Sequence, residues 1–130
     1  MLKKICIGAA LCWTVNILYL CLIRISELPE IKISYIDKYI HAFFYFVFSV
    51  LWFYALRFYL KKTNSTKLFV IVFLMAFVLG VAIELFQTFL TSSRSGDVVD
   101  VVANTSGSLL AILFIKLLGE NRFLIKFKNK

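Results

Sequence analysis

The residues of this sequence that could do chemistry begin with its only histidine. His41 lies four residues after Asp37, so in a helix the carboxylate stands one turn from the imidazole. A carboxylate in that place can orient the ring, and an oriented imidazole is a suitable general base. The same spacing also fits a histidine near a membrane interface that donates a structural hydrogen bond. We favour the functional interpretation.

Two further acidic side chains interrupt apolar segments. Glu84 is followed by Gln87 at i+3, and Asp100 is followed by Asn104 at i+4. An ionised group at the centre of a bilayer costs about 2.5 kcal/mol or more, so such groups are expected to face partners, a bundle interior or water. Glu84 could serve as an acid or a second base. As a structural residue it would instead tie its helix to the next one through Asn104.

The segment before the last apolar run allows two interpretations. Asp97 and Asp100 suit the start of a helix, where acidic side chains cap free N–H groups and favour the positive end of the helix dipole. We expect capping for Asp97 and a site role for Asp100, which shares a helical stripe with Asn104 and Gly107. Gly107 is expected to permit close helix packing. Arg94 is either an interfacial anchor or a group that holds a phosphate or carboxylate.

Four apolar runs must position these residues. The chain has 130 residues, 62% of them hydrophobic, and its mean hydropathy of +0.89 is typical of a membrane protein. A spanning helix needs about 20 apolar residues. We therefore predict an all-α, polytopic membrane protein, a single domain over residues 1–130. Its four transmembrane helices, in one bundle, are expected at about 5–23, 39–59, 68–90 and 97–118.

Helical geometry predicts that three of these helices bring polar side chains to one depth. At a rise of about 1.5 Å per residue, His41 lies about 6 Å, Glu84 about 9 Å and Asn104 about 10 Å from the same end of the bundle. Tyr45 continues the stripe of Asp37 and His41. These residues are therefore predicted to form one polar layer under a membrane surface.

The basic residues flank the apolar runs unequally. Eleven of the fifteen Lys and Arg residues lie at the two termini or around the second loop, and four lie around the first and third loops. The positive-inside rule then predicts that both termini are cytoplasmic and that the polar layer faces outward. The net charge of +8 does not indicate nucleic-acid binding, since no basic patch alternates with exposed aromatic residues.

A metal site or another cofactor is not expected from the residue types. One histidine beside carboxylates suits Mg²⁺ or Ca²⁺ better than Zn²⁺, whose sites usually draw on several His or Cys ligands.

Three spaced motifs resemble the VanZ-like family of small bacterial membrane proteins. They are DKYIHAFFYF from Asp37, ELFQTFLTSSRSGDVVD from Glu84 and ANTSGSLL from Ala103. The resemblance implies a multi-pass protein of the bacterial cytoplasmic (inner) membrane and a link to low-level resistance to the glycopeptide teicoplanin. It implies no particular reaction. The positions that match the family pattern are Asp37, Lys38, His41, Tyr45, Glu84, Gln87, Arg94, Asp100, Asn104 and Gly107.

Two classes of function follow. In the first, the chain is a membrane-embedded enzyme whose catalytic candidates are His41, Glu84 and Asp100. In the second, it is a non-catalytic protein that binds a glycopeptide, a lipid-linked cell-wall ligand or a membrane partner, or whose polar layer is structural. Membrane lipids are expected partners in both classes, and the oligomeric state stays open. The candidates for ligand binding are Asp37, Lys38, Tyr45, Gln87, Arg94 and Asn104.

Overall fold

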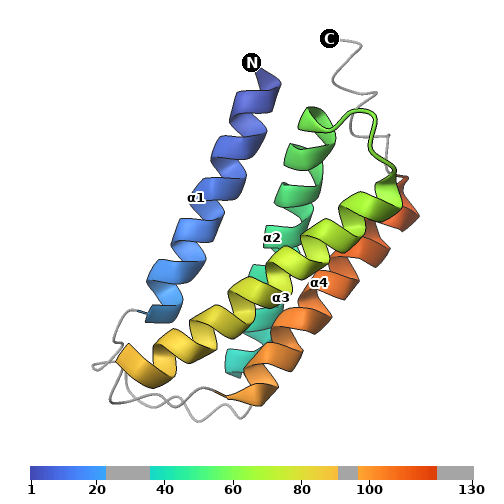
Figure 1. The fold of residues 1–130 in the computed structure, drawn as a ribbon. Coiled ribbons are helices and arrows are strands. Elements are labelled where there is room, and N and C mark those ends of the chain that lie inside the picture. Colours follow the sequence, from blue (N-terminus) through green and yellow to red (C-terminus); the bar gives the residue numbers. More distant parts are fainter. Residues whose placement is uncertain (23–35, 91–96, 120–130) are drawn as a thin grey trace.

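The computed structural model describes residues 1–22, 36–90 and 97–119, which form four helices (Figure 1). α1 spans Leu2–Leu22, α2 Ile36–Tyr59, α3 Ser65–Leu90 and α4 Val98–Leu118. Each is long and apolar enough to cross a membrane. No strand occurs among the described residues. The predicted all-α fold with four spanning helices is confirmed.

The helix boundaries differ from the predicted ones mainly at the amino ends. α1, α2 and α3 each begin three residues before the predicted start, α1 ends at Leu22, and α4 begins at Val98. The apolar runs marked the starts too late because a first turn tolerates polar residues, whose side chains can serve its free N–H groups. Asn64 does so for α3 by accepting a backbone N–H of the first turn. Asp97 does so for α4 as its N-cap.

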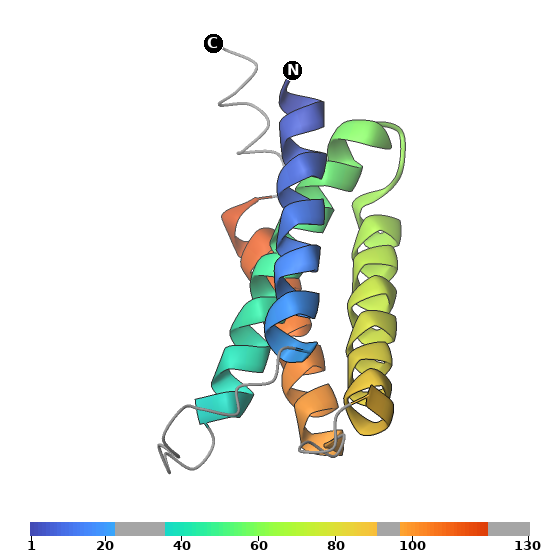
Figure 2. The same cartoon turned by 90° about the vertical axis from the view of Figure 1, so that its left-hand side faces the viewer.

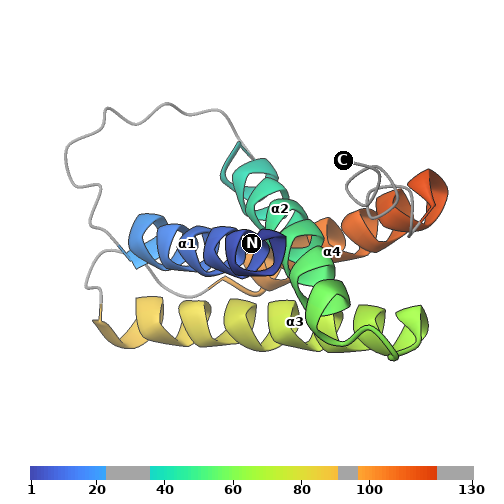
Figure 3. The same cartoon turned by 90° about the horizontal axis from the view of Figure 1, so that it is seen from above.

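α2 is the helix around which the others are arranged. It contacts α1, α3 and α4, while α3 also packs against α1 and α4. Successive helices run in opposite directions, so α2 and α4 start at the end of the bundle where α1 and α3 finish (Figure 1, Figure 2). Seen from above, α2 crosses α4 at an angle (Figure 3).

Small residues bring α2 and α4 close together. A Cβ atom added to Gly107 of α4 would overlap the backbone carbonyl of Ala42 in α2. Two turns along α2 from Ala42, the buried Ser49 Oγ donates to Ser108 Oγ at 2.9 Å. The packing role expected for Gly107 is thereby confirmed. This packing holds the part of α2 that carries His41 against α4.

Two tryptophans form hydrogen bonds between α1 and α2. Trp13 Nε1 donates to the Phe44 carbonyl at 3.0 Å, and Trp52 Nε1 donates to Thr14 Oγ1 at 3.1 Å. Apolar side chains fill the space between the helices.

Large apolar side chains also cover the outer surface of all four helices. An apolar exterior of this extent suits lipid, not water.

Charged residues separate along the bundle axis. Lys3 and Lys116 lie over the rings of Tyr59 and Phe69 at one end, where Arg57 also donates to a backbone carbonyl. Among the described residues, the acidic side chains all lie toward the other end, on the first turns of α2 and α4 and late in α3. The prediction that the basic end is cytoplasmic agrees with this separation and stays a prediction.

Candidate functional site

The acidic end of the bundle contains a buried polar cluster supplied by three helices. His41 of α2 is 3% exposed, and Glu84 of α3 and Asp100 of α4 are each 6% exposed. Tyr45 and Asn104, one turn deeper, are also buried. The predicted polar layer therefore exists as a set of side chains that meet inside the bundle.

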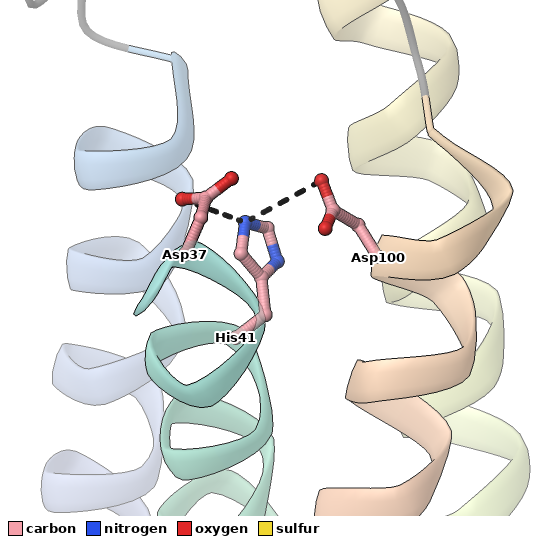
Figure 4. Close-up of side chains that lie close together, drawn as sticks. All are labelled: Asp37, His41 and Asp100. Atoms are coloured by element: carbon pink, nitrogen blue, oxygen red, sulfur yellow. Dashed lines mark ion pairs between the residues drawn. The ribbon is translucent and has the colours of Figure 1, made fainter. Parts of the chain in front are cut away.

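One ring nitrogen of His41 links α2 to α4, and the other faces two carboxylates. Nδ1 lies 3.1 Å from Asn104 Oδ1, a carbonyl oxygen that can only accept, so Nδ1 carries the proton in the neutral ring. Nε2 faces two carboxylates, at 3.9 Å from Asp37 Oδ1 and 4.0 Å from Asp100 Oδ2. Figure 4 shows the imidazole standing between the two acids. Neither distance is short enough for a hydrogen bond.

Lys38 links the starts of α2 and α4. Its ammonium donates to Asp97 Oδ2 at 2.6 Å and to Asp100 Oδ1 at 2.5 Å. The same ammonium, together with the Val99 N–H that donates to Asp97, holds the pKa of the Asp97 carboxyl below its usual range. Asp97 thus has the predicted capping role and a second role as partner of Lys38.

Glu84 ties α3 to the beginning of α4, at a place other than the expected one. Its Oε2 accepts the Asp97 backbone N–H at 2.9 Å, so the alternative in which Glu84 reaches the fourth helix through Asn104 is wrong. The helix start offers free N–H groups, which attract a carboxylate more strongly than a neutral amide does. The other oxygen, Oε1, is buried and has no hydrogen-bond partner among the residues that the structure describes.

A family model described as VanZ/LLP1 matches residues 7–119, which is most of the chain. The chain belongs to the VanZ/LLP1 family. The resemblance seen in the motifs of the sequence is confirmed. No curated protein matches the chain, and no solved structure does.

Two VanZ/LLP1 motif residues remain, Gln87 and Arg94, and the structure describes the first of them. Gln87, one turn beyond Glu84, is buried and donates to the Cys21 carbonyl at 2.8 Å, which links α3 to α1. Arg94, expected to be either an interfacial anchor or an anion-binding group, lies outside the described residues. The structure therefore brings Asp37, Lys38, His41, Glu84, Asp100 and Asn104 together, with Tyr45 below them and Gln87 on the side of α1.

One residue that shapes this VanZ/LLP1 site was missed by sequence reasoning. A Cβ atom on Gly80 would come within 3.2 Å of Asn104 Nδ2 and 3.6 Å of Tyr45 Oη. Gly80 precedes Glu84 by four residues, so it lies on the same stripe of α3. That spacing could have revealed it. The absence of a side chain there leaves room for the two deeper polar groups.

The arrangement has the elements of acid–base chemistry and of anion or cation binding. His41 offers an imidazole nitrogen that faces carboxylates, and Glu84 offers a carboxylate oxygen without a hydrogen-bond donor. Groups of this kind, placed in an environment that excludes most water, are typical of functional sites.

Proposed function

We propose that this VanZ/LLP1 protein lies in the bacterial cytoplasmic membrane with both termini inside. Its polar cluster then faces outward and binds, or acts on, a lipid-linked or cell-wall ligand, thereby lowering susceptibility to teicoplanin. The family membership and the separation of charge along the bundle support this assignment.

One observation carries the proposal: ionisable side chains from three different helices converge and are buried at a single end of the bundle. A structural link between membrane helices needs no charge, since the neutral pair of Ser49 and Ser108 already joins α2 to α4. Each ionisable group within the span costs about 2.5 kcal/mol or more near the centre and less toward the surface. Retaining His41, Glu84 and Asp100 in one place therefore favours a site over helix packing alone.

A groove in the apolar surface supports a ligand with a lipid tail. It lies among α1, α2 and α3, has a volume of about 580 Å³ and is lined almost entirely by apolar side chains, among them Phe48, Trp52 and Leu79. Phe48 packs against Tyr45, with ring centroids 6.0 Å apart. An acyl or isoprenoid chain suits the apolar lining of this groove.

The test is teicoplanin susceptibility of cells that carry the wild-type chain or one of three variants, with equal membrane levels verified. The variants are Glu84→Gln, His41→Ala and Asp100→Asn. Ser49→Ala is the matched control, because it removes a buried polar contact of the same helix pair about 12 Å deeper than His41. We expect the wild type and Ser49→Ala to protect, and the three cluster variants to lose protection.

The same experiment separates the alternatives. A wild-type chain that changes nothing contradicts the link to teicoplanin. If all variants protect as well as the wild type, the cluster is structural, as in a scaffold protein. Catalysis requires a group that exchanges protons, so loss with Glu84→Gln but not with Ser49→Ala favours turnover, whereas a binding site tolerates some neutral isosteres.

A further inference from the structure

Three side chains at the polar end have the geometry of a cation site. One ligand atom each from Asp37, His41 and Asp100 lies within 4.8 Å of the other two. Ligands bound about 2.0–2.2 Å from a metal ion stand about 3–4 Å apart, and the two distances from His41 Nε2 fall in that range, at 3.9 Å and 4.0 Å. We propose that these three residues bind a divalent cation of the Mn²⁺ or Zn²⁺ class.

The imidazole is already oriented as a metal ligand. Nδ1–H donates to Asn104 Oδ1, so in the neutral ring the lone pair of Nε2 points between the carboxylates of Asp37 and Asp100 (Figure 4). Metal-binding histidines usually donate their other ring N–H to a carbonyl or carboxylate in this way. A nitrogen lone pair and two carboxylates repel one another unless a cation or a proton lies between them. At 3.9 Å and 4.0 Å, His41 Nε2 forms no hydrogen bond with Asp37 or with Asp100.

The ammonium of Lys38 leaves one oxygen of Asp100 directed at His41. Lys38 bonds Oδ1 of Asp100, and the second oxygen, Oδ2, is the one directed at His41. The ammonium thus positions Asp100 without using the oxygen that would bind the ion.

Other buried atoms of the polar cluster, which belong to none of the three ligands, lack hydrogen-bond partners among the described residues. Within the described part of the chain, Tyr45 Oη, Glu84 Oε1 and Asn104 Nδ2 are buried without a hydrogen bond, and each belongs to a residue at least nine-tenths buried. Buried polar atoms are nearly always satisfied, by protein or by ordered water. The cluster therefore has buried atoms that ordered water could satisfy, and a hydrated cation carries such water.

The donor set selects the class of ion. The preference for Mg²⁺ or Ca²⁺ over Zn²⁺ that the residue types suggested is replaced here, because the structure directs the Nε2 atom of His41 at the two carboxylates. An imidazole nitrogen favours first-row transition ions over Mg²⁺ and Ca²⁺, and carboxylates bind both Mn²⁺ and Zn²⁺. Three protein ligands leave coordination positions for water or for an oxygen of an anionic ligand, as in sites that react rather than sites that only stabilise a fold. This inference concerns the same cluster as the proposed function, but cation binding needs no envelope ligand and is tested without one.

The experiment uses the full chain purified in detergent micelles and stripped with a chelator. Free Mn²⁺ is followed by its electron paramagnetic resonance signal, and Zn²⁺, Mg²⁺ and Ca²⁺ are added as competitors. We expect one Mn²⁺ per chain, displaced by Zn²⁺ and poorly by Mg²⁺ or Ca²⁺. Loss of a ligand in His41→Ala, Asp100→Asn or Asp37→Asn should weaken binding more than about 100-fold, beyond the 10–100-fold typical for a residue that supports a ligand.

Two variants serve as comparisons. Asn104→Ala removes the acceptor that orients His41 and should weaken binding about 10–100-fold. Asp97→Asn removes the same charge as Asp100→Asn from the same Lys38 partner, yet it takes away no ligand atom and keeps a residue suited to the N-cap. It should change binding less than about fivefold, the effect of one exposed charge. Circular dichroism checks that every variant keeps its helix content.

The proposal is overturned by any of three results. The first is that the wild type shows no saturable binding of Mn²⁺ or Zn²⁺, and the second is that it prefers Ca²⁺ or Mg²⁺. The third is that Asp97→Asn and Asp100→Asn weaken Mn²⁺ binding equally, which would indicate that charge alone attracts the ion. Because Asp37 is half-exposed at the start of α2, Asp37→Asn should fold even where a buried variant does not. A wild-type chain that binds Mn²⁺ but gives no protection against teicoplanin contradicts the proposed function alone. A wild-type chain that protects but does not bind Mn²⁺ contradicts the cation site alone.

Discussion

Substitution of Gly107 by alanine tests whether the close approach of α2 and α4 holds the polar cluster together. The added Cβ atom would overlap the Ala42 carbonyl, and the atoms in its way belong to backbone. Nonbonded carbon atoms are most favourable at about 3.5–4.0 Å, so the two helices must move apart by at least about 1 Å. Overpacking of this kind costs about 1–3 kcal/mol, and we expect a loss of about 2 kcal/mol or more for Gly107→Ala.

The displacement should also reach His41, which precedes Ala42 and bonds Asn104 across the same helix pair. The free energy of unfolding is measured in mixed micelles with increasing sodium dodecyl sulfate, followed by circular dichroism. Gly8→Ala is the control, because its Cβ atom would meet nothing within 4 Å. Alanine at this exposed helical position should be neutral or stabilising by up to about 1 kcal/mol.

Gly80→Ala should rank between the two, since its Cβ atom would meet side-chain atoms of Asn104 and Tyr45 at 3.2 Å and 3.6 Å and not backbone. The expected order of stability is therefore Gly8→Ala, then Gly80→Ala, then Gly107→Ala. If Gly107→Ala unfolds at the same denaturant concentration as Gly8→Ala, the contact between α2 and α4 does not hold the bundle as the structure indicates.

Two further predictions concern topology and acid sensitivity. The topology test uses a chain whose native cysteines are replaced by alanine. Lys62 and Val98 are exposed at opposite ends of the bundle, so Lys62→Cys should react with an impermeant thiol reagent only from the cytoplasmic side and Val98→Cys only from outside. The reverse pattern contradicts the proposed orientation. Lys38 lowers the pKa of the Asp97 carboxyl in the folded protein. This ion pair therefore stabilises the fold above the pKa of an unfolded aspartate, about 3.9. Its contribution is lost as the pH falls through the lower pKa of the folded state. Asp97→Asn should accordingly lose less stability than the wild type between about pH 6 and about pH 2, and identical pH profiles would show that the pair contributes nothing to folding.

The agreement between sequence and structure is greatest where local rules apply. The four spans follow from the length of the apolar runs, because a helix is the simplest way to satisfy the backbone of a single segment in lipid. The stripes of polar residues follow from the helical period, which places Asp37 and His41, or Asp100 and Asn104, on one face. Asp97 capping α4 was predicted from residue type and position alone.

Contacts between helices were predicted less well, because they depend on distances that no single helix determines. Glu84 meets the backbone N–H of Asp97 and not Asn104, and Lys38 meets Asp97 and Asp100. Both outcomes depend on how far α4 slides along α2 and α3. A shift of one helical turn is about 5.4 Å, enough to exchange one partner for the next.

By itself, the sequence determined the membrane class, the number of spans and the depth at which polar residues gather, since these depend on local composition and on the fixed helical rise. The family followed from the resemblance of three spaced motifs. Only the tertiary structure decided that the Asn104 carbonyl turns the free nitrogen of His41 toward Asp37 and Asp100, at distances suited to a cation. The physical reason is the packing of Gly107 against Ala42, which sets the separation and register of α2 and α4. A site assembled from side chains of two helices exists only once that register is established.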